Sequence, residues 1–292
     1  MKEKFKGTIY LILATVIWGG AFVAQSVGMD HVGPFTFQTL RCTLAALFLF
    51  PLNRFTEKKD EFTRKWTDRK LWTTGILAGL ALFCAASLQQ VSLQHTTAGK
   101  AGFLTAMYIV LVPMLGLFIG KKPNLNAWIS VAMAVLGLYL LSGADLKNIN
   151  FADWMLLGCA FFFAVQITII DRIGLVFDGI RLNCVQSLVC AVLSSLFMWF
   201  TEDPDMGNIL RCWLPLCYAG ILSMGIAYTL QIFGQQKLEP TQASILMSLE
   251  SVFALIFGWL LLHERLSPAE LLGCGTMFCA VILSQMPKKS PV

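Results

Sequence analysis

The chain has 292 residues, of which 57% are hydrophobic and only 13% are charged, and its mean hydropathy is +0.69. A soluble domain is usually about one quarter charged, so this composition excludes a protein that folds mainly in water. The net charge is +5, and the segments between the apolar stretches are too short to contain a catalytic or nucleic-acid-binding domain.

Apolar stretches follow one another along the whole chain, each long enough to cross a hydrocarbon core about 30 Å thick as a helix of roughly 20 residues. The first stretch is longer than the apolar part of a usual signal peptide and nine more follow it, so we expect it to be retained. We predict an all-α, polytopic membrane protein with ten transmembrane helices, at residues 7–28, 35–53, 71–91, 98–120, 125–143, 151–170, 182–200, 213–232, 241–262 and 268–286.

The orientation in the membrane follows from the distribution of lysine and arginine. Most basic residues of the connecting segments fall on the side that holds both termini, including Lys2, Lys4, Lys6 and the segment 54–70. The positive-inside rule therefore predicts cytoplasmic termini, in a multi-pass protein of the plasma membrane. We expect the lipid bilayer, not nucleic acid, to be the partner of the basic segments, and we expect a monomer.

An internal repeat divides the chain into two halves. Residues 78–94 align with 219–235 so that Gln90 matches Gln231 and Gln94 matches Gln235, and an offset of 143 then carries span 98–120 onto span 241–262. We predict two five-helix repeats, residues 1–147 and 148–292. Because five is odd, the second repeat enters the membrane from the opposite side, and such inverted folds usually hold their substrate site near the midplane between the repeats.

Glu250 and Arg41 are the charged residues that lie beyond the first turn of a predicted span. At a rise of 1.5 Å per residue the two side chains can reach similar depths, and a charge at such depth needs a partner or water. We expect them either to pair directly or to face one aqueous cavity. Glu250 is also our candidate for proton coupling, because isolated carboxylates inside membrane spans often serve proton or substrate pathways.

Polar and aromatic side chains in other spans are further candidates for the cavity. Gln90 and Gln231 occupy equivalent positions in the two repeats, where they either line a cavity or bond neighbouring helices. Lys100 is near a span end, where it either snorkels to the interface or reaches inward to an anionic group. The candidates for the substrate cavity are Trp18, Arg41, Gln90, Lys100, Thr105, Tyr108, Tyr228, Gln231 and Glu250.

Cysteine and histidine patterns give no sign of a metal or of catalysis. The nine cysteines form no CxxC pair, the three histidines are isolated, and neither a GxSxG nor a phosphate-binding glycine loop occurs. We therefore predict no metal, no cofactor, no catalytic residues and no enzymatic activity.

Four segments of the chain are distinctive: IWGGAFVAQ (17–25), LRCTLAALFL (40–49), TTAGKAGFLTAMYIVLVP (96–113) and PTQASILMSLESVFALIFGWLLLHERLS (240–267). Together they resemble the EamA-type drug/metabolite transporter superfamily. This resemblance covers nearly the whole chain and implies ten helices in two inverted repeats, no bound cofactor, and transport of amino acids, nucleobases or other small metabolites, often as an exporter. Where the family commonly has SLEP, this chain has Ser248, Leu249, Glu250 and Ser251, so it lacks the proline that would bend this helix.

We predict a secondary-active transporter of small metabolites that works by alternating access through a cavity between the repeats. Both signs of charge near that cavity fit a zwitterion such as an amino acid, whereas a direct pair of Arg41 and Glu250 would leave a pocket for a neutral compound. A channel, or a lipid or lipophile flippase of the same fold, is the alternative.

Overall fold

The computed structural model describes residues 2–56, 65–96, 98–121, 123–142, 150–262 and 267–286. Every regular element in these ranges is a helix, which confirms the predicted all-α class. The elements are α1 (Lys2–Met29), α2 (Pro34–Thr56), α4 (Arg69–Ser92), α5 (Ala98–Thr105), α6 (Tyr108–Phe118), α7 (Leu125–Ser142), α8 (Phe151–Ile169), the π-helix η1 (Ile170–Gly174), α9 (Gly179–Thr201), α10 (Met206–Arg211), α11 (Trp213–Cys217), the π-helix η2 (Tyr218–Ala227), α12 (Tyr228–Gln235), α13 (Pro240–Met247), α14 (Glu250–Leu262) and α15 (Pro268–Gln285).

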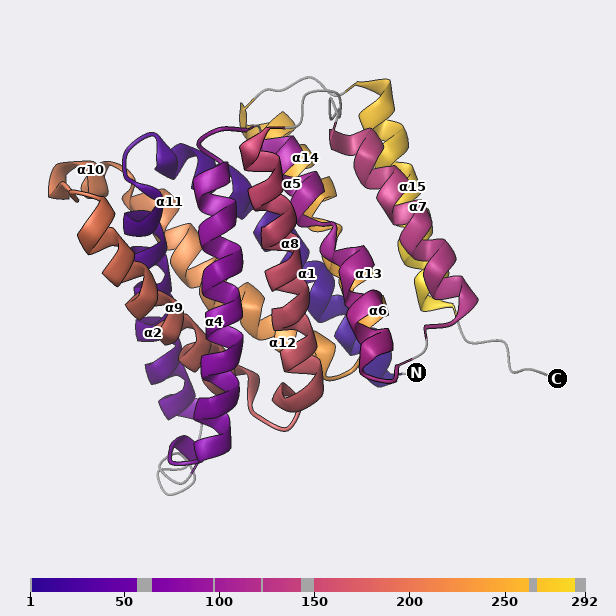
Figure 1. The fold of residues 1–292 in the computed structure, drawn as a ribbon, viewed down its shortest axis with the longest axis horizontal. Coiled ribbons are helices and arrows are strands. Elements are labelled where there is room, and N and C mark those ends of the chain that lie inside the picture. The colour runs from indigo at the N-terminus through magenta and orange to yellow at the C-terminus, as the bar shows by residue number, and fades with distance from the viewer. Residues whose placement is uncertain are drawn as a thin grey trace.

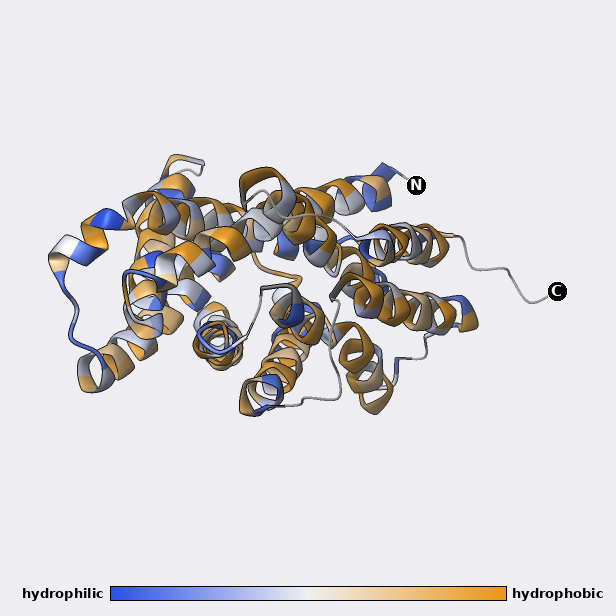
Figure 2. Cartoon of the chain, turned by 90° about the horizontal axis from the view of Figure 1, so that it is seen from above, coloured by the Kyte–Doolittle hydropathy of each residue, from blue (hydrophilic) through white to orange (hydrophobic). Residues whose placement is uncertain are grey.

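The helices form a bundle of membrane-spanning length. Within the described ranges, nine helical stretches are long and apolar enough to cross a membrane, and Leu125–Leu141 adds a shorter apolar helix. Several spans are composite, since α5 with α6, α8 with η1, α11 with η2 and α12, and α13 with α14 each make one crossing. Figure 2 shows hydrophobic residues along most of the helices, with hydrophilic segments gathered mainly at their ends and in the connections.

Short polar residues determine where several helices begin. Asp178 precedes α9 and its carboxylate accepts a hydrogen bond from the backbone N–H of Arg181, at 3.2 Å. Asn150 and Asp153 form a reciprocal capping box at the start of α8, and Ser267 and Glu270 form another at the start of α15. Such side chains satisfy backbone N–H groups that a helix start would otherwise leave without a partner.

The two halves of the bundle run in opposite directions. In Figure 1, α1 rises from the end of the bundle where the N-terminus lies, whereas α8, which starts the second half, descends from the opposite end. The last helix, α15, ends on the side where α1 begins. The halves are interleaved, because α2 packs against α9 and α4 packs against both α8 and α9. The predicted boundary between residues 147 and 148 lies outside the described residues and stays a prediction.

Two of the composite spans are interrupted within one residue of matching positions. The first interruption separates α5 from α6 at Ala106 and Met107, and the second separates α13 from α14 at Ser248 and Leu249. Each contains tight i to i+3 hydrogen bonds, for example from the N–H of Ile109 to the carbonyl of Ala106 at 3.0 Å, and such bonds tighten the chain locally. The second span is therefore interrupted although it lacks the proline of the SLEP pattern.

Candidate functional site

A central cavity lies between the repeats at the level of the two interruptions. Its volume, measured as the space open to the centre of a water molecule, is about 40 Å³. One ordered water needs roughly 10–15 Å³ on this measure, so the cavity has room for water. The residues that line it come from both repeats: Trp18, Ala21, Phe22, Gln25, Arg41, Gln89, Tyr108, Phe163, Ile167, Ser223, Tyr228, Gln231, Met247 and Glu250.

Glu250 and Tyr108 meet where the two interrupted spans face each other. Glu250 is the first residue of α14 and Tyr108 is the first residue of α6. The Tyr108 hydroxyl donates a hydrogen bond of 3.0 Å to Glu250 Oε1. Glu250 is only 8% exposed, and none of the described basic residues forms an ion pair with it. The carboxyl group is thus held by one neutral donor.

Arg41 lines the same cavity and is held by amide groups. Its Nη1 donates to Gln25 Oε1 at 2.6 Å and its Nε donates to Gln38 Oε1 at 3.1 Å. Gln25 is itself anchored, since its Nε2 donates to the carbonyl of Ala21 at 3.1 Å. No described carboxylate pairs with Arg41. Of the two arrangements predicted for Arg41 and Glu250, the structure therefore contains the shared cavity and not the direct pair.

Aromatic side chains form part of the cavity wall. The rings of Trp18 and Tyr228 meet edge to face with 5.1 Å between their centroids, and those of Tyr108 and Phe163 meet in the same way at 6.4 Å. The indole N–H of Trp18 is buried and has no hydrogen-bond partner among the described residues. A buried donor without a partner is costly, so this N–H is available to a polar ligand.

The glutamines of the two repeats have different roles. Gln231 lines the cavity and donates to Gln235 Oε1 at 3.1 Å, as residues four apart on one helix face can do. Gln90 does not line the cavity, although it is fully buried, and no described residue bonds its amide. Its neighbour Gln89 lines the cavity instead. Successive residues of an α-helix point about 100° apart. Gln89 therefore faces the cavity in the place where the sequence predicted Gln90.

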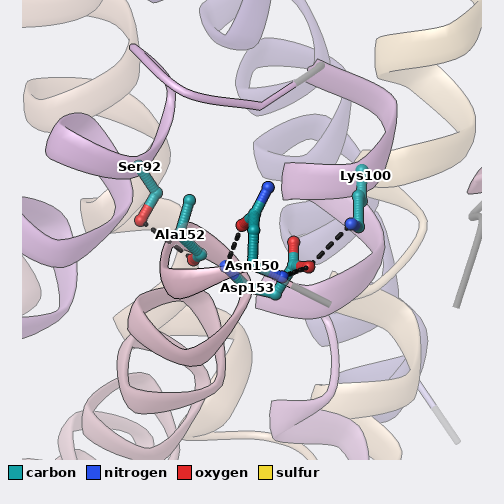
Figure 3. Close-up of polar contacts among 5 residues, drawn as sticks. All are labelled: Ser92, Lys100, Asn150, Ala152 and Asp153. Carbon is teal, nitrogen blue, oxygen red and sulfur yellow. Dashed lines mark hydrogen bonds and ion pairs between the residues drawn. The ribbon is translucent and has the colours of Figure 1, made fainter. Parts of the chain in front are cut away.

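Thr105 and Lys100 also lie outside the set of lining residues. Thr105 is buried just behind Gln89, whose Nε2 donates to Thr105 Oγ1 at 3.2 Å. Lys100 lies near the start of α5 and its Nζ is 2.7 Å from Oδ2 of Asp153. Figure 3 shows this pair beside the capping box that Asp153 forms with Asn150. Lys100 does reach an anionic group, but that group is a carboxylate of the protein's own second repeat.

Several lining residues were not predicted from the sequence, among them Gln25, Gln89, Phe163 and Ser223. Gln25 lies seven residues after Trp18 in one long helix, and positions seven apart share a helix face. A glutamine at that spacing in an apolar span was a usable signal for the cavity. Ser223 lies in the π-helix η2, and no pattern in the sequence predicts that change of winding.

An all-helical bundle that inverts its second half around a polar central cavity defines a multi-pass membrane transport protein. The model of the EamA-like transporter family matches residues 5–143 and 150–286, which confirms the resemblance described above and the presence of two repeats. The chain belongs to the EamA-like transporter family. Membership in a family of transporters also confirms the prediction that the protein is not an enzyme.

Curated relatives of similar length match almost the whole chain. An uncharacterized transporter of Archaeoglobus fulgidus is 31% identical over 276 residues, covering 94% of this chain and 83% of the relative. The threonine/homoserine exporter RhtA of Escherichia coli is 28% identical over 280 residues, covering 93% and 88%. A solved structure described only as a crystal structure of a protein superposes with a TM-score of 0.79 at 17% identity, covering 96% of each chain, which shows a shared fold.

Proposed function

We propose that this transporter carries small zwitterionic metabolites of the amino-acid type through the central cavity, in the direction of export. The observation that carries the proposal is the placement of Arg41 and Glu250, which line one cavity without pairing with each other. The guanidinium then binds the carboxylate of a substrate and the Glu250 carboxyl group binds its ammonium. Arginine suits the first role because its N–H groups match the geometry of a carboxylate.

The relatives support the same substrate class. RhtA is named as an exporter of threonine and homoserine, which are small amino acids with one hydroxyl group. Buried charges are costly unless compensated, so a ligand that brings one charge of each sign to the cavity offsets the cost of both Arg41 and Glu250.

We further propose alternating access, with both termini in the cytoplasm of a cell that carries the protein in its plasma membrane. Inverted repeats provide two related arrangements of one bundle around a fixed site. Ion pairs join the repeats on both sides of the cavity, Lys100 with Asp153 at one end and Lys121 with Asp171 at the other. Opening to either side requires the pair at that end to separate.

Glu250 is our candidate for coupling transport to protons. Its carboxyl group is bonded by the Tyr108 hydroxyl and by no described cation, so the substrate ammonium and a proton are alternative ways to neutralise it. Exchange of one for the other at this group would link substrate movement to proton movement in the opposite direction.

The test is counterflow and proton-driven uptake of labelled threonine and homoserine in proteoliposomes. We expect the native protein to show saturable counterflow, which a channel does not produce, and accumulation when a pH gradient is imposed. Glu250→Gln is expected to abolish accumulation while the purified protein stays monodisperse. Glu3→Gln, which changes an exposed carboxylate at the start of α1, is the matched control. Unaltered proton-driven uptake by Glu250→Gln would refute the assignment.

A further inference from the structure

A series of hydrogen-bonded, buried amide side chains runs from η2 to the cavity. Which group of each amide donates and which accepts can be deduced from the end of the series at η2. Asn183 Nδ2 lies 2.8 Å from the carbonyl oxygens of Met224 and of Gly225, and 3.0 Å from Thr229 Oγ1. Carbonyl oxygens accept hydrogen bonds and cannot donate them, so the NH₂ group of Asn183 must face η2. Its Oδ1 therefore faces the other way and can only accept.

In the rest of the series, each amide likewise donates to the amide that lies nearer η2. Gln186 Nε2 donates to Asn183 Oδ1 at 2.8 Å, and Gln166 Nε2 donates to Gln186 Oε1 at 3.2 Å. Gln231 Nε2 then donates to Gln166 Oε1 at 3.1 Å. Turning any one amide over would place NH₂ against NH₂ or oxygen against oxygen. The orientation set at η2 is therefore transmitted to Gln231.

Gln235 forms a second arm of the series, a separate hydrogen-bonded branch that ends at Gln231. Gln235 Nε2 donates to the carbonyl of Ile167 at 3.0 Å, so its Oε1 is left to accept, and it accepts from Gln231 Nε2 at 3.1 Å. Both N–H groups of Gln231 are consequently used. Its Oε1 is buried and has no hydrogen-bond partner among the described residues, while the residue itself lines the cavity.

We propose that Gln231 Oε1 is a fixed acceptor for the ammonium group of the substrate, and that Gln166, Gln186 and Gln235 are positioning residues that prevent this amide from turning over. An amide that is free to rotate binds donors and acceptors alike, whereas Gln231 presents an acceptor alone. The subsite therefore favours a ligand with a primary amine and rejects one that offers a carboxylate or another acceptor there. This inference rests on the proposed function, since it assigns one end of the zwitterion.

The test measures thermal stabilisation of the purified protein by three probes, because a ligand stabilises the folded state by mass action. The probes are homoserine, 3-amino-1-propanol, which lacks its carboxylate, and 4-hydroxybutanoate, which lacks its amine. We expect Gln231→Met to weaken the two amines about ten-fold, the usual effect of losing one hydrogen bond to a charged group, and to leave 4-hydroxybutanoate unchanged. Gln90→Met is the matched control, since Gln90 is the repeat equivalent and lies off the cavity; it should leave all three affinities unchanged.

The positioning role is tested with Gln166→Met, which frees one N–H of Gln231. The amide can then offer a donor, so we expect the preference for homoserine over 4-hydroxybutanoate to fall several-fold. Gln166→Glu in its neutral form keeps an acceptor oxygen for Gln231 Nε2 and an O–H donor for Gln186 Oε1, so it should retain the preference. Should Gln166→Met not fold, Gln235→Met removes the acceptor of the other arm and makes the same prediction.

The outcomes separate the two proposals. If the native protein binds none of the three probes, the zwitterionic substrate class of the proposed function is wrong. If it binds homoserine but Gln231→Met weakens all three probes equally, the ammonium subsite is wrong. If Gln166→Met and Gln235→Met, each as a single variant, both retain the preference for homoserine over 4-hydroxybutanoate, the positioning role of these amides is wrong.

Discussion

Lys100 Nζ lies 2.7 Å from Asp153 Oδ2, and this ion pair ties α5 of the first repeat to the start of α8 in the second. Lys121 and Asp171 pair in the same way at the other end of the same two spans. The α5–α6 span of the first repeat is therefore joined by ion pairs to the α8–η1 span of the second repeat on both sides of the cavity. In the alternating-access mechanism proposed above, the inward-facing and outward-facing states differ in which of these two ion pairs is broken.

We predict that Lys100→Met destabilises the protein by about 1–3 kcal/mol, because it leaves the carboxylate of Asp153, which is nearly buried, without its cation. Lys6→Met is the control, since Lys6 pairs with Glu3 where both side chains are about 60% exposed and such surface pairs contribute little. The thermal unfolding of both variants in detergent gives the comparison. Equal unfolding temperatures for Lys100→Met and the native protein would show that the Lys100–Asp153 pair does not stabilise the contact between the two spans.

Tyr108→Phe should lower the initial rate of uphill threonine transport several-fold with little change in stability. The variant loses the hydroxyl that holds Glu250 Oε1 but retains the ring that packs against Phe163. Tyr10→Phe removes a hydroxyl from a ring that faces Phe233, away from the cavity, and should transport normally. The assignment of Tyr108 fails if both variants transport at the native rate.

Gly19→Ala should destabilise the bundle by about 1–3 kcal/mol, the usual cost of overpacking. A Cβ on Gly19 would lie 2.6 Å from the backbone carbon of Phe253 and 2.8 Å from the nitrogen of Ala254, so α1 and α14 would have to separate. Gly275→Ala in α15 has no atom within 4 Å of the added Cβ and should be neutral or slightly stabilising. Unfolding midpoints of the two variants test this, and a neutral Gly19→Ala would mean that the helices are not in close contact there.

Asp178→Asn tests a pH dependence in the connection before α9. Burial raises the pKa of Asp178 above its ordinary value, despite hydrogen bonds from backbone N–H groups and from Asn53. Because this pKa is higher in the folded than in the unfolded protein, protonated Asp178 contributes to the free energy of unfolding. The contribution is complete below the pKa in the unfolded protein, about 3.9, and is lost as the pH rises through the pKa in the folded protein. Asparagine keeps the helix cap without the charge, so its unfolding temperature relative to the native protein should increase from pH 4 to pH 7. A difference that stays constant over this range would contradict the prediction.

The sequence was most informative where one residue differed strongly from its surroundings. Glu250 and Arg41 were identified because charges in apolar spans are costly, and the structure places both in one cavity. Gln90 and Gln89 show the limit, because a polar residue in a span signals a polar contact but not the rotation of its helix. Asp153 and Gln25 could not be predicted as the partners of Lys100 and Arg41, since they reach them only through packing between separate helices. Gln38, in contrast, lies three residues before Arg41 in α2.

The π-helical winding of η2 has a consequence for everything that follows it in the span. A π turn holds more residues than an α turn, so rewinding η2 as an ordinary α-helix would lengthen it and rotate α12 about its own axis. Gln231, which lies just beyond η2, would then swing off the cavity wall even if no neighbouring helix tilted. The position of Gln231 on the cavity wall thus depends on the winding of η2, and Asn183, which donates to two carbonyls of η2, holds that winding in place.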